Sequence, residues 1–385
     1  MVTVEDMGPR PVLTAPLLLE QESDSTYRAP NLLKRVLSLL ANVRPGSDLT
    51  RFQLPPLFNL PKSQLQCHGE SVYCTGGDLL SKCANGETSM ERFISVVAWS
   101  VSTVRPLMFG VAPYNPILGE THHVSRGTLN VLLEQVSHHP PVSALHATDE
   151  KDNIEMTWCH YPVPKFYGTH IETEVNGRRQ LKLLNKEETY EMNSPKLVIR
   201  LFPMLGVDWL GTVTIKCEET GIAAELHYRG NSFFPRPGIH RSIKGRIFMT
   251  SSSSKTIYEI SGHWDRTVTA KDLNTGKSKI IYDAKEALSG VKTPIVKDSQ
   301  QGIWRTESTV VWGDVSQAIL NKSWDKAKEA KSAIEERERE RVKERKSQGQ
   351  NWVPKHFTVS YSKENGWDCL PIQKSVPPAP IVAPF

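Results

Sequence analysis

The middle of the chain, from about residue 118 to 285, consists of short hydrophobic segments separated by polar turn clusters. The segments are rich in Val, Ile, Thr and Tyr, which favour β-strands. Four pairs of segments flank short polar runs, as antiparallel hairpins do: Leu129–Gln135 with Asn153–His160, Thr212–Cys217 with Ala223–Tyr228, Arg246–Thr250 with Thr256–Ser261, and Thr267–Lys271 with Ser278–Tyr282. A meander of this length leaves exposed edges unless it closes, so the pattern predicts a barrel that encloses a cavity.

Two stretches before this region show helical spacing. The stretch Asn31–Val43 ends before Pro45 and carries one apolar face, made of Leu33, Val36, Leu37 and Leu40. Such a helix either packs into a core or acts as a movable lid or a membrane-touching helix. A second helix is predicted from Met90 to Ser102.

The two ends of the chain differ from its centre. Residues 1–30 contain four prolines, among them Pro9, Pro11 and Pro16, and little periodicity, so we expect them to be loosely structured. The stretch Lys326–Lys346 has 15 charged residues out of 21, nine positive and six negative, which predicts a long solvated helix. Residues 375–385 are rich in proline and are predicted to form a flexible tail.

Composition narrows the class of protein. Of 385 residues 38% are hydrophobic, enough for a core, and 23% are charged, which is normal for a soluble protein. The chain has neither a run of about 18 apolar residues nor a basic segment followed by an apolar one at its start, so we expect no membrane span and no secretory signal. Six scattered cysteines without a CxxC pair predict free thiols in the cytosol. The net charge of +5 suits an anionic membrane surface or nucleic acid and does not choose between them.

Adjacent histidines followed by two prolines stand out in the segment Glu134–Ala144. Pro140 forces an extended conformation on its predecessor and cannot donate to a ladder, so the strand should break here. The break could let His138 and His139 reach one site at a barrel mouth, where imidazoles would donate to an anion such as phosphate. Three alternatives remain: histidines bound to backbone carbonyls, a metal site that adds His122 and His123, and a hydrolase, for which no GxSxG or P-loop pattern is present.

Several motifs resemble those of the oxysterol-binding protein family. The string EQVSHHPP at residues 134–141 is similar to the family signature, and PYNPILGE at residues 113–120 is similar to a second one. GHWD at residues 262–265 and WVPKHF at residues 352–357 also resemble family elements. The charged helix shows the family spacing of Lys, Glu and Arg at intervals of four. The resemblance runs from about Leu32 to about Phe357 and is closest to the short plant members that lack a pleckstrin-homology domain.

The resemblance implies a mainly β (α+β) fold. It is a large incomplete antiparallel β-barrel around a lipid tunnel, with an N-terminal lid and helices and a C-terminal helical subdomain. The implied divisions are a flexible N-terminus (1–30), a lid helix (31–46), an N-terminal helical segment (47–117), the barrel (118–315), the C-terminal helical subdomain (316–374) and the Pro-rich tail (375–385).

The charged helix receives a role only through the resemblance. Its Lys, Glu and Arg lie within an arc of about 80°, and taken alone they form a surface ladder in which each pair adds about 0.2–0.5 kcal/mol. The resemblance implies that the helix lies at the barrel mouth, where Lys331 and Arg339 bind phosphate and Glu335 orients them. The implied phosphoinositide headgroup site is His138, His139, Lys331, Glu335, Arg339, Asn115 and Glu120. One position departs from the family, because many members have Lys where this chain has Ala112.

The resemblance also implies the function. We expect a carrier of sterol, phosphatidylinositol 4-phosphate or both between membranes; the alternatives are a carrier of another lipid such as phosphatidylserine, a His-rich metal-dependent enzyme, and a nucleic-acid-binding scaffold. We expect a non-enzyme without cofactor or metal. It should be a monomer that contacts anionic membrane surfaces transiently and binds no nucleic acid. The expected location is the cytosol and the periphery of membranes, including contact sites of the endoplasmic reticulum.

Overall fold

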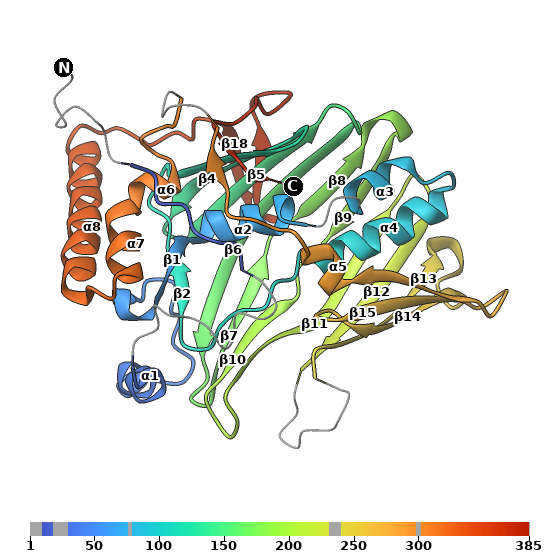
Figure 1. The fold of residues 1–385 in the computed structure, drawn as a ribbon, viewed down its shortest axis with the longest axis horizontal. Helices are drawn as coiled ribbons and strands as arrows, with labels where there is room; N and C mark the ends of the chain where they lie inside the picture. The colour runs from blue at the N-terminus through green and yellow to red at the C-terminus, as the bar shows by residue number, and fades with distance from the viewer. Residues whose placement is uncertain (1–9, 18–29, 76–78, 231–239, 298–301, 385) are drawn as a thin grey trace.

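One large curved sheet dominates the molecule (Figure 1). The computed structural model describes residues 10–17, 30–75, 79–230, 240–297 and 302–384. The α-helices are α1 Leu32–Leu40, α2 Gln64–Tyr73, α3 Leu79–Asn85, α4 Ser89–Ser102, α5 Ala284–Leu288, α6 Ser308–Val311, α7 Gly313–Leu320 and α8 Trp324–Ser347. Short 3-10 turns cover η2 Pro56–Phe58, η3 Leu184–Lys186 and η4 Thr250–Ser252.

The strands follow in chain order and belong to three sheets. They are β1 Asn59–Ser63, β2 Ala112–Tyr114, β3 Thr121–Arg126, β4 Leu129–His138, β5 Pro141–Asp149, β6 Ile154–Phe166, β7 His170–Asn176, β8 Arg179–Leu183, β9 Glu188–Met192, β10 Lys196–Arg200, β11 Gly206–Cys217, β12 Ile222–Arg229, β13 Ser242–Met249, β14 Thr256–His263, β15 Thr267–Asp272, β16 Ser278–Asp283, β17 Ile295–Val296, β18 Phe357–Ser362, β19 Gly366–Pro371 and β20 Ile381–Val382. Strands β1 and β2 pair with each other, as do β18 and β19, and the remaining strands form the large sheet.

The large sheet is an incomplete barrel. Its main path among the described residues runs β16-β15-β14-β13-β12-β11-β10-β7-β6-β5-β4-β3-β20-β17, and β8 and β9 form a second connection between β6 and β11. All neighbours on this path are antiparallel except β20 and β3, which are parallel. The edge strands β16 and β17 do not pair with each other in the described part of the chain, so the curved sheet stays open. The predicted mainly β class with an incomplete antiparallel barrel is confirmed.

Three of the four predicted hairpins are confirmed as β11–β12, β13–β14 and β15–β16. The first is wrong, because β5 lies between β4 and β6 and pairs with both. Strand β5 mixes Ser, His, Thr and Ala with few large apolar side chains, so its composition carries no strong strand signal. Two neighbouring strands satisfy its backbone instead, which only the assembled sheet can provide.

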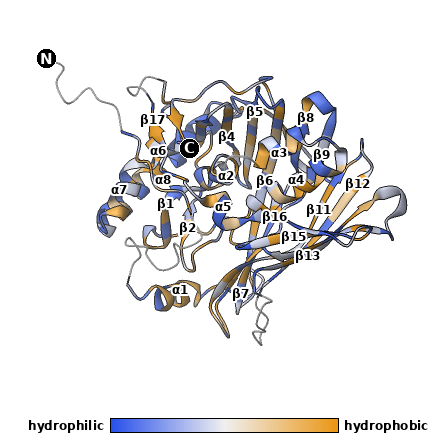
Figure 2. Ribbon diagram, turned by 45° about the vertical axis from the view of Figure 1, so that its right-hand side comes forward, coloured by the Kyte–Doolittle hydropathy of each residue, from blue (hydrophilic) through white to orange (hydrophobic). Residues whose placement is uncertain are grey.

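Helices α2, α3 and α4 pack on one face of the sheet (Figure 1). Helix α4, expected from Met90 to Ser102, begins after Thr88, whose hydroxyl accepts from the Glu91 backbone N–H while the Glu91 carboxylate accepts from the Thr88 N–H. Its side chains Phe93, Trp99 and Val101 are fully buried, and each such burial contributes about 1.5–3 kcal/mol. Along the strands hydrophobic and hydrophilic residues alternate, as the orange and blue segments of Figure 2 show. Because neighbouring side chains point to opposite faces, the sheet has an apolar face on which these helices pack.

Two terminal segments are more ordered than predicted. Most of residues 1–30 lies outside the described residues, but the expectation of loose structure is wrong for 10–17, where the Val12 N–H donates to the Thr309 carbonyl at 3.0 Å and Leu17 is buried. The prediction of a flexible tail is also wrong. Strand β20 pairs with β3, Ile381 is 1% exposed, and the Ala383 N–H donates to the Ser125 carbonyl at 2.9 Å. The physical reason is that apolar tail residues cover a strand that would otherwise be an open edge.

The other two predicted helices, α8 and α1, are both present, but α1 is buried differently from the prediction. Helix α8 matches the charged stretch. It buries Ala327 and Lys331, packs Trp324, Ala330 and Ile334 partly buried against the same side, and exposes most of its charged side chains. Helix α1 buries only Val36 and Leu40, whereas Leu33 and Leu37 are 39% and 48% exposed. The predicted single apolar face is therefore split between the protein and the surface. None of the described helices combines the length and apolarity needed to cross a membrane.

We predict that Ile381→Ala lowers the free energy of unfolding by about 2–4 kcal/mol, because it empties a buried position on β20. Urea titration followed by circular dichroism measures this. The control is Ile372→Ala, whose side chain is 57% exposed and should change stability by less than about 0.5 kcal/mol. Equal stabilities of the two variants would contradict the docked tail.

Candidate functional site

The charged helix α8 presents one buried cation, Lys331. Its Nζ donates to the Asn59 Oδ1 at 2.9 Å and to the Leu54 carbonyl, and it lies 3.9 Å from the Glu335 carboxylate. On the other side of Glu335, the exposed Arg339 lies 3.7 Å from the second carboxylate oxygen. The predicted triplet is therefore a connected row, with a buried lysine at one end and a solvent-exposed arginine at the other.

Burial lowers the pKa of Lys331, and the neighbouring Glu335 opposes that shift. The ammonium group loses hydration that its protein partners replace only in part. An anion beside Nζ would restore the missing interaction and favour the charged form. Lys331 is thus suited to bind an anion.

Asn59 links Lys331 to the second signature motif. Its Nδ2 donates to the carbonyls of Ala112 at 3.1 Å and Pro113 at 3.4 Å, and Asn59 faces Ala112 in the parallel β1–β2 pair. The segment 112–116 therefore runs beside the position of Lys331. Ala112, where many family members have Lys, lies next to the amide that holds Lys331.

The histidine pair lies at the other end of this segment. His138 Nδ1 donates to the Pro116 carbonyl at 2.9 Å, and the rings of His138 and His139 are 4.7 Å apart between centroids. Because a carbonyl can only accept, Nδ1 carries the proton, and Nε2 is an acceptor unless the ring gains a second proton. Burial, with a contribution from His139, lowers the pKa of His138. His139 is exposed.

The structure thus arranges most of the predicted site residues along one segment. Residues 112–116 connect the surroundings of Lys331 to those of His138, and Asn115 is exposed between them. Helix α8, the end of β4 and this segment supply donors and positive charge. That combination fits an acceptor-rich anion such as a phosphate ester.

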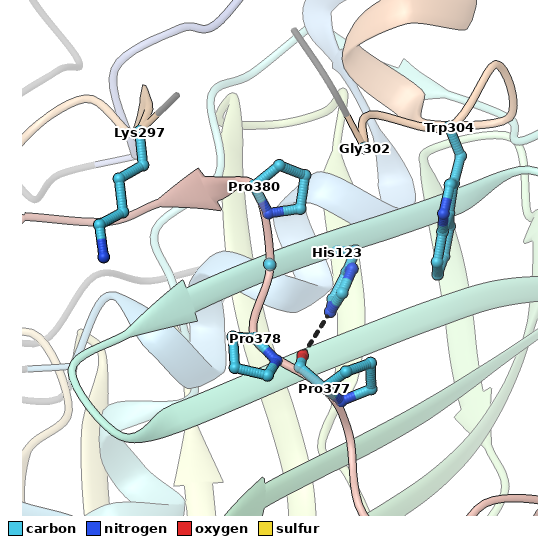
Figure 3. Close-up of a pocket in the computed structure, with 8 residues that line it drawn as sticks. His123, Lys297, Gly302, Trp304, Pro377, Pro378 and Pro380 are labelled. Atoms are coloured by element: carbon cyan, nitrogen blue, oxygen red, sulfur yellow. Dashed lines mark hydrogen bonds between the residues drawn. The ribbon is translucent and has the colours of Figure 1, made fainter. Parts of the chain in front are cut away.

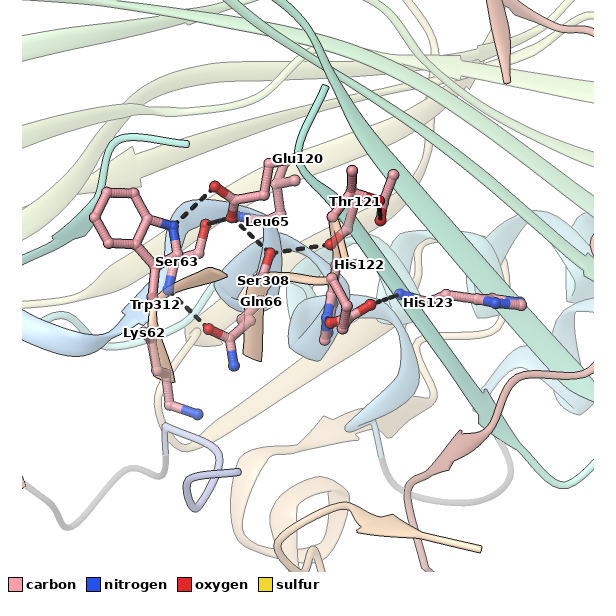
Figure 4. A network of polar contacts seen from close by, with 12 residues as sticks. Lys62, Ser63, Leu65, Gln66, Glu120, Thr121, His122, His123, Ser308 and Trp312 are labelled. Atoms are coloured by element: carbon pink, nitrogen blue, oxygen red, sulfur yellow. Dashed lines mark hydrogen bonds and ion pairs between the residues drawn. The ribbon is translucent and has the colours of Figure 1, made fainter. Parts of the chain in front are cut away.

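Glu120 does not fit the predicted headgroup site. Its side chain is 0% exposed and accepts hydrogen bonds from the Ser63 hydroxyl, the Ser308 hydroxyl at 2.6 Å, the Trp312 indole at 2.8 Å and the Ile117 N–H at 3.0 Å (Figure 4). Burial raises the pKa of Glu120, and these donors counteract the rise. All its acceptor capacity is directed into the protein, where it ties β1, β3 and α6 together. We correct its role to a structural one.

The second histidine pair also serves the fold. His122 contacts the Glu307 carboxylate through Nδ1 at 2.7 Å and the Tyr73 hydroxyl through Nε2 at 3.0 Å, so both ring nitrogens have protein partners. His123 Nε2 contacts the Pro377 carbonyl at 2.8 Å. Among the residues that the structure describes, no three His, Cys, Asp or Glu side chains are grouped to hold a metal ion.

A pocket of about 340 Å³ lies beside His123 (Figure 3). Pro377, Pro378 and Pro380 of the tail form one wall, and Trp304, stacked on His123 at 5.1 Å between centroids, forms another. Neither His138 nor a residue of the α8 row lines it. The pocket results from tail docking and is separate from the predicted site.

An exposed apolar surface surrounds helix α1, the predicted lid, and is here called the lid-end surface. Phe202 N–H donates to the Thr169 carbonyl at 3.2 Å and Gly46 N–H donates to the Phe166 carbonyl at 2.6 Å, so the β10–β11 loop, the β6–β7 turn and the chain after α1 adjoin. Figure 1 shows α1 near the ends of β7 and β10. The exposed large side chains here are Leu33, Leu37, Phe52, Tyr167, Phe202, Met204 and Leu205.

The family follows from the comparison with known proteins. The model of the family described as "Oxysterol-binding protein" matches residues 36–374. The chain belongs to the oxysterol-binding protein family. It is 54% identical to oxysterol-binding protein-related protein 4C of Arabidopsis thaliana over 97% of this chain and 99% of that protein. This confirms the predicted resemblance to a short plant member.

Two solved structures share the fold of this member of the oxysterol-binding protein family. The Osh1 ORD domain in complex with ergosterol matches with a TM-score of 0.73 and 22% identity, over 94% of this chain and 90% of that one. The Osh3 ORD of Saccharomyces cerevisiae in complex with PI(4)P matches with a TM-score of 0.69 and 21% identity, over 96% of both chains. At these identities the likeness establishes the fold.

Sequence reasoning missed Asn59 and Leu54. Both lie in the proline-rich stretch 53–61, and an asparagine between hydrophobic residues gives no sign of its partner. Their roles depend on Lys331, which is 272 residues away from Asn59 in the sequence. Only the packing of α8 against η2 reveals them.

We predict that Glu120→Gln lowers the free energy of unfolding by about 1–3 kcal/mol. An amide N–H₂ in place of Oε2 would face the Trp312 indole and the Ile117 N–H, which can only donate, and one in place of Oε1 would remove the acceptor of the Ser63 and Ser308 hydroxyls. Urea titration measures it. Asn115→Ala, at an exposed position of the same motif, should change stability by less than about 0.5 kcal/mol. An unchanged stability of Glu120→Gln would return Glu120 to the candidate ligand contacts.

Proposed function

We propose that this protein binds a sterol or a phosphoinositide and carries it between membranes. The observation that supports this most is the placement of Lys331 and the His138–His139 pair at opposite ends of segment 112–116. Family relatives provide the ligand classes: solved relatives hold ergosterol, cholesterol or PI(4)P. The apolar part of either ligand would lie inside the curved sheet, and a phosphorylated headgroup would lie at these donors.

In this proposal the headgroup phosphate accepts from Lys331, Arg339 and the two histidines. Glu335 already lies between Lys331 and Arg339, and its carboxylate orients both cations or accepts from an inositol hydroxyl. Asn115 contributes its exposed amide. Glu120 does not contact the headgroup in this proposal. It stabilises the fold next to segment 112–116 by accepting hydrogen bonds from Ser63 and Trp312.

Ala112 weakens the case for one particular headgroup. The site holds one cation fewer than in family members with Lys at this position, and a hydrogen bond to a charged group contributes about 1.5–3 kcal/mol. Phosphatidylserine, whose headgroup carries a carboxylate and an ammonium besides its phosphate, is the alternative anionic lipid. No covalent bond is made or broken in either case, so the proposed protein is a carrier and not an enzyme.

Helix α1 is proposed as the lid. Its buried side chains Val36 and Leu40 pack in one cluster with Phe166 at the end of β6 and Leu201 just after β10. A sterol buries several hundred Å² of apolar surface, on the order of 10 kcal/mol at about 25 cal/mol/Å², so the ligand leaves only where a membrane can take it up. A lid that opens at a bilayer and closes in solution provides that condition.

The lid-end surface is the proposed membrane contact. Residues 31–53 carry four exposed cations and only one acidic side chain, Asp48. The cations are Lys34, Arg35, Arg44 and Arg51. Each well-placed cation contributes about 1 kcal/mol of attraction to an anionic leaflet, and the exposed apolar side chains would enter the headgroup layer. Ligand exchange would then take place beside the lid.

We predict that replacing both His138 and His139 by Ala lowers extraction of phosphatidylinositol 4-phosphate from liposomes at least about tenfold and changes sterol extraction less than about twofold. Ala112→Lys should raise phosphoinositide extraction. The assay uses labelled phosphoinositide, sterol or phosphatidylserine, one at a time. Extraction of none of the three by the wild type would refute the proposed function, and equal loss of sterol and phosphoinositide would assign the histidines to folding.

We predict that phosphoinositide affinity falls as the pH rises from 7.0 to 8.5. His138 has a lowered pKa in the free protein and is therefore neutral there, so a bound phosphate must raise that pKa and take up a proton. The phosphate monoester, with a second pKa of about 6, stays almost fully ionised over this range. Titration calorimetry in two buffers detects the proton, and a flat profile equal to that of His138→Gln would exclude the linkage.

We predict that Phe202→Ser with Met204→Ser and Leu205→Ser slows lipid transfer between anionic vesicles about tenfold, equivalent to about 1.4 kcal/mol of lost insertion. Binding of a fluorescent sterol in solution should stay unchanged. The matched control replaces Ile280, Leu370 and Ile372 by Ser, since these side chains are 63%, 52% and 57% exposed away from the lid. Equal transfer rates for both triple variants would rule out this surface.

A further inference from the structure

Two cysteines far apart in the sequence meet inside the molecule. Cys159 lies on β6 and Cys369 on β19, their Sγ atoms are 2.8 Å apart, and 210 residues separate them. They are 2% and 3% exposed and share a small apolar cluster with Val142 and Phe357. No other two cysteine sulfurs in the described part of the chain are in contact.

We propose that Cys159 and Cys369 are a disulfide-forming pair that links the C-terminal hairpin to the large sheet. A disulfide bond is about 2.05 Å long, so the sulfurs need to approach by only about 0.8 Å. The other four cysteines have no such partner. Cys67, Cys74 and Cys83 lie on or next to helices α2 and α3, and Cys217 ends β11.

The oxidant is a low-molecular-weight disulfide of the glutathione class. The thiolate of one cysteine attacks a sulfur of that disulfide, which forms a mixed disulfide and releases one small thiol. The second cysteine then attacks the protein sulfur of the mixed disulfide and releases the second small thiol. The pair loses two electrons and two protons, and the small disulfide is reduced to two thiols.

Access to the sulfurs is through the hairpin β18–β19. The hairpin has only two strands, its Tyr361 and Leu370 are 62% and 52% exposed, and the exposed Arg178–Asp368 ion pair at 3.3 Å joins it to the sheet. Its buried contacts with the sheet are limited to the small cluster around Cys159 and Cys369, so it opens locally at less cost than the sheet. Its contact with Cys159 and burial both raise the pKa of Cys369, which makes the reaction slow at neutral pH and faster in alkali.

The link would restrain the segment that follows α8. The N–H groups of Lys355 and His356 donate to the Glu134 carboxylate at 2.8 and 2.9 Å immediately before β18 begins. Trp352 packs against Gly119 of the second signature motif, where a Cβ would lie 3.1 Å from the indole. A covalent bond at Cys369 therefore holds this segment on the sheet even when the hairpin would open.

The test is oxidation of the folded full-length chain with glutathione disulfide at pH 8, followed by denaturation, alkylation of remaining thiols and mass spectrometry. The expected result is four alkylated cysteines instead of six and a peptide pair joined through Cys159 and Cys369. The melting temperature should rise by several degrees on oxidation and return after reduction with dithiothreitol, since the bond closes a long loop.

Variants separate this pair from the others. Cys369→Ser should lose both the crosslink and the oxidation-dependent shift in melting temperature, whereas Cys74→Ser should keep both. Because the wild-type mass measurement needs no variant, a misfolded Cys369→Ser would leave the outcome decidable. Six alkylatable thiols after oxidation, glutathione adducts alone, or a crosslink to another cysteine would overturn the proposal.

Discussion

The open edges of the large sheet are the constraint on which the rest of the structure depends. Strands β16 and β17 end the main path without meeting each other among the described residues, so their outer backbone groups need cover. Helix α4 lies against β12 and β16, and the tail strand β20 lies between β3 and β17. The sheet therefore needs these helices and the C-terminal strand as cover. The way they pack on the sheet in turn determines where the site residues lie.

Burial of charge shapes the candidate site. Lys331 and Glu120 are both buried, and each is held by several partners from distant parts of the chain: Asn59 and Leu54 for Lys331, Ser63, Ser308 and Trp312 for Glu120. The two differ in what their partners leave open. Burial shifts the pKa of both groups against the charged form, so the difference lies in the geometry: hydrogen-bond donors occupy both carboxylate oxygens of Glu120, whereas the carboxylate nearest to Lys331 lies at 3.9 Å. A buried cation that is not fully compensated is the more suitable ligand contact.

The division between exposed and buried apolar side chains also distinguishes α1, the proposed lid, from an ordinary surface helix. Helix α1 buries Val36 and Leu40 in the cluster with Phe166 and Leu201, packs Leu32 and Leu39 against it, and leaves Leu33 and Leu37 exposed. The apolar face of α1 is therefore only partly covered by the protein, and the rest of it is exposed. Its outward side chains join those of the β10–β11 loop, so one end of the molecule combines the lid, apolar side chains and positive charge.

The sequence by itself determined the features that depend on local pattern. Alternation and turns predicted the hairpins from β11 to β16, apolar residues at helical spacing predicted α1 and α4, and the run of mixed charges predicted α8. The motifs around His138 and Lys331 predicted the family. Tertiary structure alone decided what depends on distant partners. Strand β5 forms only between two neighbouring strands, and Ile381 is buried only at the edge of β3. Glu120 has a structural role because Ser308 and Trp312, which are distant in the sequence, donate to it, and Asn59 has a role because it binds Lys331. Such roles are invisible in the sequence because hydrogen-bond partners and burial are properties of the folded arrangement, not of neighbouring residues.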